Sequence, residues 1–131
     1  GLPDLPPEEA GTLIPAARTL GLDTVFLVAP TSTRSRLEAV TSACRGFVYA
    51  VSVTGVTGAR AGPSQEVPDL LRRVREVSAL PVAVGFGVAD PESARALAEL
   101  ADGVVVGSAL IAALAEGRDM AGLAESIAAA C

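Results

Sequence analysis

Residues 81–110, PVAVGFGVADPESARALAELADGVVVGSAL, hold two successive units of a strand followed by a helix. The apolar runs Pro81–Gly85 and Gly103–Val106 are short and nearly continuous, which is typical of strands buried on both faces of a parallel sheet. Between them, Asp90 followed by Pro91 predicts a helix start, because Asp caps free N–H groups and Pro suits the first turn. The stretch therefore predicts an α/β fold.

The same alternation extends over the rest of the chain. Two further apolar runs predict strands at 24–29 and 46–53. Further helices are predicted near Thr12, over 34–43 and 66–78, from Ser108 to Gly117 and from Asp119 to the end. No linker interrupts residues 1–131, so we expect one unit of parallel βα repeats. Four strands are few for a doubly wound open sheet but are half of a (β/α)₈ barrel, which typically takes about 250 residues.

Composition excludes several classes of function. All ten cations are Arg, and the chain contains neither Lys nor His, which removes Schiff-base chemistry and the commonest general base and metal ligand. A net charge of −5 argues against nucleic-acid binding. The apolar runs are shorter than the roughly 20 residues that a membrane span needs. Cys44 and Cys131 match no metal spacing, and reduced thiols in a cytoplasmic protein are expected.

Glycine follows two of the predicted strands directly. Gly85-Phe86-Gly87 ends the third strand, and Gly107-Ser108 ends the fourth at the start of a short helix. In parallel βα folds ligands bind beyond the carboxyl ends of the strands, and the first N–H groups of a helix attract anions. One such turn is explained by tight geometry alone, but the consecutive pair favours a phosphate site.

Other candidate residues leave two interpretations open. The glycine-rich residues 52–62 predict either a lid over substrate or an idle surface loop. Asp4 is a general acid or base, or a cap for the helix behind it. Tyr49 is a pocket wall or a core residue. The start Leu2-Pro3-Asp4, directly before a helix, is typical of the last residues of a strand, so we expect the chain to be part of a larger barrel. No pair of carboxylates falls at the predicted strand ends.

Six segments, in order and spacing, resemble the tryptophan synthase alpha chain family. They are PDLPPEE at 3–9, FLVAPT at 26–31, GFVY at 46–49, GVTG at 55–58, VGFGV at 84–88 and GSA at 107–109. The resemblance implies the second half of a (β/α)₈ TIM barrel, from the end of strand four onward. It implies a lyase of tryptophan biosynthesis that cleaves indole-3-glycerol phosphate to indole and glyceraldehyde 3-phosphate without a cofactor of its own, in a heterotetramer with a beta chain that carries pyridoxal phosphate.

The resemblance also assigns roles to individual residues. Phosphate-binding positions are Gly58, Gly87, Gly107 and Ser108; indole-pocket positions are Leu27, Tyr49 and Phe86; the lid threonine is Thr57; and the beta-chain side carries Asp4 and Pro6. The family's catalytic Glu and Asp lie on earlier strands, so no catalytic residue is assigned here and the 131 residues alone are expected to be inactive. The alternative is a non-catalytic phosphate-binding half-barrel that self-associates. Four more strands ahead of Gly1, forming the missing first half, would decide between them.

Overall fold

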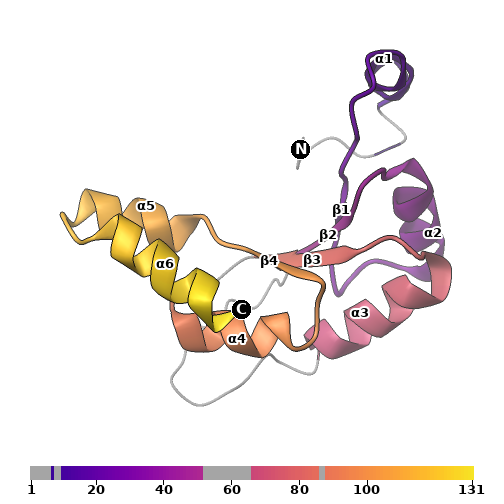
Figure 1. The fold of residues 1–131 in the computed structure, drawn as a ribbon. Coiled ribbons are helices and arrows are strands. Elements are labelled where there is room, and N and C mark those ends of the chain that lie inside the picture. Colours follow the sequence, from indigo (N-terminus) through magenta and orange to yellow (C-terminus); the bar gives the residue numbers. More distant parts are fainter. Residues whose placement is uncertain (1–6, 8–9, 52–65, 86–87) are drawn as a thin grey trace.

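The computed structural model describes residues 7, 10–51, 66–85 and 88–131, and helices and strands alternate along them (Figure 1). The helices are α1 (Leu13–Thr19), α2 (Arg34–Ala43), α3 (Glu66–Val77), α4 (Pro91–Ala98), α5 (Ser108–Ala115) and α6 (Met120–Ala130). The strands are β1 (Leu27–Val28), β2 (Val48–Val51), β3 (Val82–Gly85) and β4 (Gly103–Val105). The predicted order of elements is confirmed.

The strands form one parallel sheet in the order β1-β2-β3-β4. Leu27, Tyr49, Ala83 and Gly103 stand in register across it, and therefore share one face. The strands β1 and β4 lie at the two edges. Thus the predicted parallel βα architecture is confirmed, with a two-residue β1 where the apolar run predicted 24–29.

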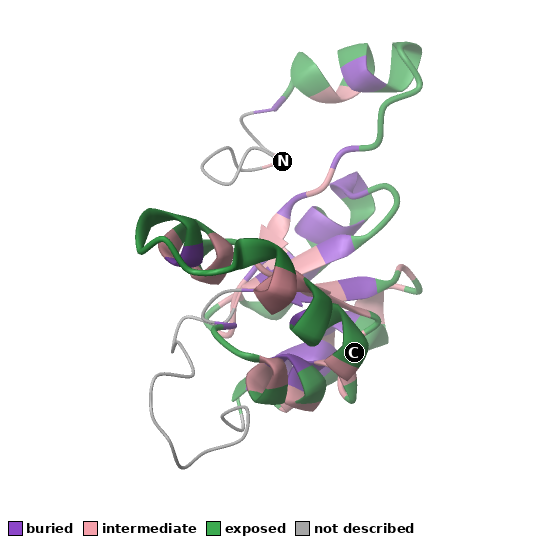
Figure 2. Ribbon diagram, turned by 60° about the vertical axis from the view of Figure 1, so that its left-hand side comes forward, coloured by how far each residue is buried: buried purple, intermediate pink, exposed green. Residues whose placement is uncertain are grey.

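One face of the sheet is sealed by helices α2, α3 and α4. The sealed layer contains Val28, Val48, Ala50, Val82 and Val84 from the strands, with Leu37, Val40, Leu70, Leu71, Val74, Ala94 and Leu97 from the helices. Figure 2 shows this buried layer between strands and helices. The spacing of Val67, Leu70, Leu71, Val74 and Val77 predicts one apolar stripe on the helix at 66–78. The burial of the first four confirms this stripe as the packing face of α3.

The opposite face is only partly covered by the described elements, as expected for half of a barrel, whose inner face is left exposed. Leu27, Tyr49 and Ala83 are half-buried there, and Val105 is 38% exposed. A continuous apolar run is typical of a strand with an apolar layer on each of its two faces. The described helices α2, α3 and α4 cover only one of these faces. We call this second surface, defined by Leu27, Tyr49, Ala83, Gly85 and Val105, the open face.

Several helices begin or end at residues that are typical of helix termini. The Asp90 carboxylate accepts a hydrogen bond from the Ser93 N–H (2.8 Å), and the Asp90 N–H donates to Ser93 Oγ (3.4 Å). These two bonds make a reciprocal cap, with Pro91 in the first turn of α4. Gly117, at φ +68°, ends α5. Helix α1 begins after Thr12, so Pro15 falls in its first turn, where the missing N–H costs nothing.

Helices α5 and α6 extend the chain beyond β4. Helix α6 packs against both α4 and α5, while α1 stands apart from them on the β1 side (Figure 1). Within the described residues, no helix combines the length and apolar character needed to cross a membrane.

Candidate functional site

The turn from β4 into α5 presents an open helix start. Gly107 occupies the N-cap position at φ −134° and ψ −72°, and no side chain caps the helix there. Both Gly107 and Ser108 are exposed, and a methyl group added to Gly107 would meet no atom within 4 Å. The N–H groups of the first helical turn lack partners inside the helix and carry partial positive charge. A small anion can therefore approach the backbone at this position.

The neighbouring turn after β3 opens at the same edge of the sheet. Gly85, the last residue of β3, stands in register with Val105, the last residue of β4. The two glycine-bearing turns therefore leave adjacent strands side by side, as the sequence predicts. Phe86 and Gly87 lie outside the described residues, so the second half of this turn stays a prediction.

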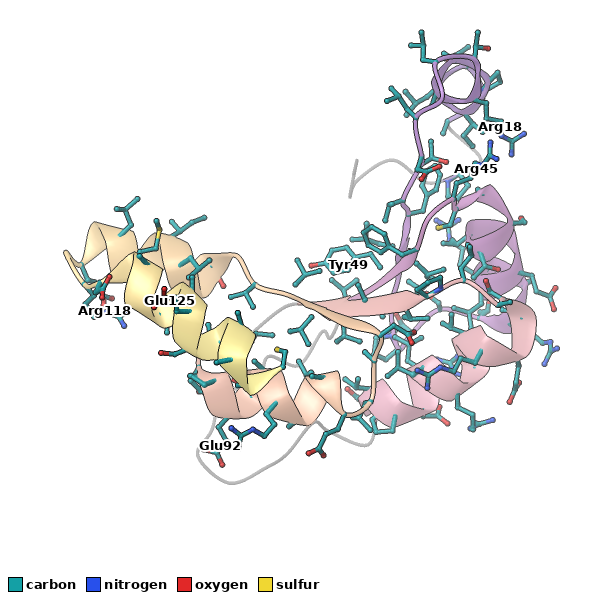
Figure 3. All side chains as sticks on the ribbon, in the orientation of Figure 1. Arg18, Arg45, Tyr49, Glu92, Arg118 and Glu125 are labelled. Atoms are coloured by element: carbon teal, nitrogen blue, oxygen red, sulfur yellow. The ribbon has the colours of Figure 1, made fainter. Side chains whose placement is uncertain are left out.

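Tyr49 and Leu27 are neighbours on the open face. They are paired in register on β2 and β1, and both are half-buried. In Figure 3, the Tyr49 side chain lies on the side of the sheet away from α3 and α4. The register thus brings together two of the three predicted pocket residues, and it favours a wall facing the open side over a fully buried core position for Tyr49.

Two perturbed titratable groups in the described part of the chain have structural causes, one of them in the connection from β3 to α4. Burial raises the pKa of the Cys44 thiol, which follows α2 at the opposite end from the strand carboxyl ends. Hydrogen bonds from Ser93 lower the pKa of Asp90, a helix cap. Both cysteines are free, and no group of three metal-ligating side chains occurs among the described residues. The described arrangement is suited to binding an anion and an apolar ring.

A family model described as "Tryptophan synthase alpha chain" matches residues 2–130. The chain belongs to the tryptophan synthase alpha chain family. The alpha chain of Deinococcus radiodurans is 53% identical over 131 residues, which are 99% of this chain and 48% of that relative. The alpha chain of Mycobacterium avium is 54% identical over 115 residues, covering 88% of this chain and 42% of that relative.

Solved structures of alpha chains superpose closely. A tryptophan synthase structure from M. tuberculosis matches with a TM-score of 0.85 and 45% identity, over 98% of this chain and 48% of the other. A tryptophan synthase structure from Pyrococcus furiosus matches with a TM-score of 0.80 and 42% identity, over 95% and 51%. This chain thus spans about half the length of the relatives that it matches. The predicted family and the barrel-type βα fold are confirmed.

The predicted site residues fall into two groups, those that the structure describes and those that it does not. Leu27, Tyr49, Gly107 and Ser108 are described residues, the first two on the open face and the last two at the start of α5. The remaining predicted residues, Asp4, Pro6, Thr57, Gly58, Phe86 and Gly87, lie outside the described residues. The assigned roles of both groups stay predictions.

Sequence reasoning missed one contact at this edge of the sheet. Arg73 of α3 donates hydrogen bonds to the carbonyls of Pro30 and Ser32, at 2.7 Å each. Those partners lie more than forty residues away along the chain. The pattern of residues 72–75 shows only that Arg73 lies off the apolar stripe, so no local signal distinguishes it from Arg72 or Arg75.

Proposed function

We propose that this chain supplies the substrate-binding half of a tryptophan synthase alpha chain. The complete enzyme cleaves indole-3-glycerol phosphate to indole and glyceraldehyde 3-phosphate. The observation that carries the proposal is the family match over residues 2–130, together with the uncapped, exposed Gly107–Ser108 helix start directly after β4.

The phosphate end of the substrate is assigned to the turns after β3 and β4. Gly107 and Ser108 offer backbone N–H groups, and Ser108 adds a hydroxyl donor. The turns after β3 and β4 start side by side, because Gly85 and Val105 are in register. This supports the proposal that Gly87, on the turn after β3, and Gly58, from the predicted lid, also bind the phosphate. This arrangement needs no cationic side chain, since unpaired donors and the helix dipole supply the attraction.

The indole end of the substrate is assigned to the open face. Leu27 and Tyr49 give a half-buried, largely apolar surface where β1 and β2 pair. Phe86, one residue beyond β3, completes the wall in this proposal. An aromatic ring placed there removes apolar area from water, and Tyr49 can pack against it edge to face.

The acid and base of the reaction belong to the other half of the family's barrel. General acid and base groups typically contribute about 10²–10⁴-fold to a rate. The 131 residues alone are therefore proposed to bind without turning over. A beta-chain partner is also proposed, because a P. furiosus relative is described as part of an a2b2 complex. Asp4 and Pro6 would face that partner, in a cytoplasmic assembly.

A chimeric barrel tests this function. In the D. radiodurans alpha chain, the half that matches this sequence is replaced by residues 1–131, which share 53% identity with it. The chimera is expected to release indole from indole-3-glycerol phosphate, because the relative contributes the carboxylates and this chain contributes the binding residues. Residues 1–131 alone are expected to release none.

The parent alpha chain serves as the control for the assay. A chimera that folds cooperatively and shows no indole release, while the parent remains active, would overturn the proposed function. Indole release by the purified 131 residues alone would overturn the proposal that this half binds the substrate and the other half supplies the acid and base.

A further inference from the structure

Arg73 joins helix α3 to the loop between β1 and α2. Its Nη1 atom donates to the carbonyl of Ser32 and its Nη2 atom donates to the carbonyl of Pro30, each at 2.7 Å. One guanidinium therefore spans two carbonyls of the same loop. The planar fork of Arg suits such a two-point contact, and charge-assisted hydrogen bonds are stronger than neutral ones.

The loop that Arg73 holds is a tight turn at the carboxyl end of β1. The Ser32 N–H donates to the Ala29 carbonyl (2.8 Å), and the Ser32 hydroxyl accepts from the Ala29 N–H (3.0 Å). These local bonds define the shape of the turn. They do not connect the turn to the neighbouring helix, and Arg73 supplies that connection.

Burial makes this contact stronger than its exposed neighbours. The Arg73 side chain is 27% exposed, and its Nε atom lies 3.4 Å from the Asp69 carboxylate one turn earlier on α3. By comparison, Arg34 also links α2 to α3 through Glu76, but its side chain is 68% exposed. Exposed ion pairs contribute little, so Arg73 is the principal polar link between the loop and α3 among the described contacts.

We propose that Arg73 is a positioning residue for the substrate pocket of the proposed lyase. The clamped turn begins two residues after Leu27, the pocket wall on β1, and lies at the sheet edge where ligands bind in βα barrels. By holding Pro30 and Ser32 against α3, Arg73 keeps the end of β1 and the adjoining wall in place. This inference rests on the proposed function, but the clamp itself can be measured without turnover.

The matched pair Arg73→Met and Arg72→Met tests the clamp in the chimeric barrel. Both changes remove an Arg from α3, but Arg72 pairs only with Asp69 and Glu76 of its own helix in its described contacts. Arg73→Met removes both hydrogen bonds to the loop. It is expected to raise KM for indole-3-glycerol phosphate about tenfold because the pocket wall is then less well fixed, with kcat changed less than about twofold. Arg72→Met should leave KM and kcat unchanged. Arg73→Lys should raise KM less than Arg73→Met does.

Amide hydrogen exchange provides the second readout. Arg73→Met is expected to speed exchange of the Ser32 amide about tenfold while leaving the β2 and β3 amides near their original rates. Equal effects of Arg73→Met and Arg72→Met, or an increase spread evenly over the sheet, would overturn the proposal. If Arg73→Met fails to fold, Arg73→Lys decides: faster Ser32 exchange alone supports the clamp, and no change rejects it. An inactive chimera would refute the proposed lyase function, while the Ser32 exchange would still test the clamp.

Discussion

Tyr49 and Gly85 lie against each other on the open face of the sheet. A methyl group at Gly85 would come within 2.7 Å of Tyr49 Cε2 and 2.9 Å of Val105 Cβ. Real side chains do not tolerate such distances, so one neighbour would have to move. Gly85 is therefore required at the end of β3 for packing, in addition to its place before the proposed phosphate-binding turn.

Gly85→Ala is expected to destabilise the fold by about 1–3 kcal/mol, the usual cost of overpacking. Urea unfolding of the chimeric barrel measures this free energy. Gly103→Ala is the matched control, since a methyl group there would sit at an ordinary 3.7 Å from Ala83 Cβ. Equal losses for the two variants would refute the close-packing argument.

The cap at Asp90 predicts a dependence of stability on pH. Hydrogen bonds from Ser93 lower the pKa of this carboxyl, so the charged form is favoured in the folded state. The stabilisation is complete above the ordinary Asp pKa and is lost as the pH falls through the lowered one. Asp90→Ala should cost about 1 kcal/mol at pH 7. Thermal unfolding should show this difference shrinking in acid, and a constant difference would contradict the account.

Residues 1–131, prepared alone, are expected to self-associate. Strands β1 and β4 are the sheet edges, and the open face carries half-exposed Leu27 and Tyr49 with Val105. Free edges and apolar surface favour pairing between chains. Light scattering should give a mass above that of one chain. A monodisperse monomer that unfolds cooperatively is the result that would reject this expectation.

Gly107→Val is expected to weaken substrate binding without unfolding the protein. The φ at this position is negative and an added Cβ would meet no atom within 4 Å. We therefore expect the branched side chain to be accommodated and to cover the first N–H groups of α5. In the chimera, KM for indole-3-glycerol phosphate should rise at least about tenfold with the unfolding free energy nearly unchanged. An unchanged KM would remove Gly107 from the phosphate site.

Much of the fold was predictable because its signals are local. The Asp90–Pro91 helix start and the apolar stripe through Leu70 and Leu71 are written within a few residues, and both are confirmed. The extent of β1 was not predictable in this way. Its ladder covers only Leu27–Val28, because regular pairing at a sheet edge depends on the single neighbouring strand.

The candidate site was predictable in part for the same reason. Gly107 and Ser108 were predicted because a glycine between a strand and the next helix leaves the first N–H groups of that helix accessible to an anion. In the structure this helix start has no side-chain cap. The contact of Arg73 with Pro30 and Ser32 joins residues distant in sequence, so only the folded chain reveals it. The closeness of Tyr49 to Gly85 depends likewise on strand register.

The central claim is that this chain carries the phosphate-binding end of the substrate site. It is tested most directly by titrating the chimeric barrel with inorganic phosphate while following the amide chemical shifts of Gly107 and Ser108. Saturable shifts are expected at these two amides, absent at the far end of α5 and lost in Gly107→Val. A well-dispersed spectrum in which neither amide responds to phosphate would contradict the account.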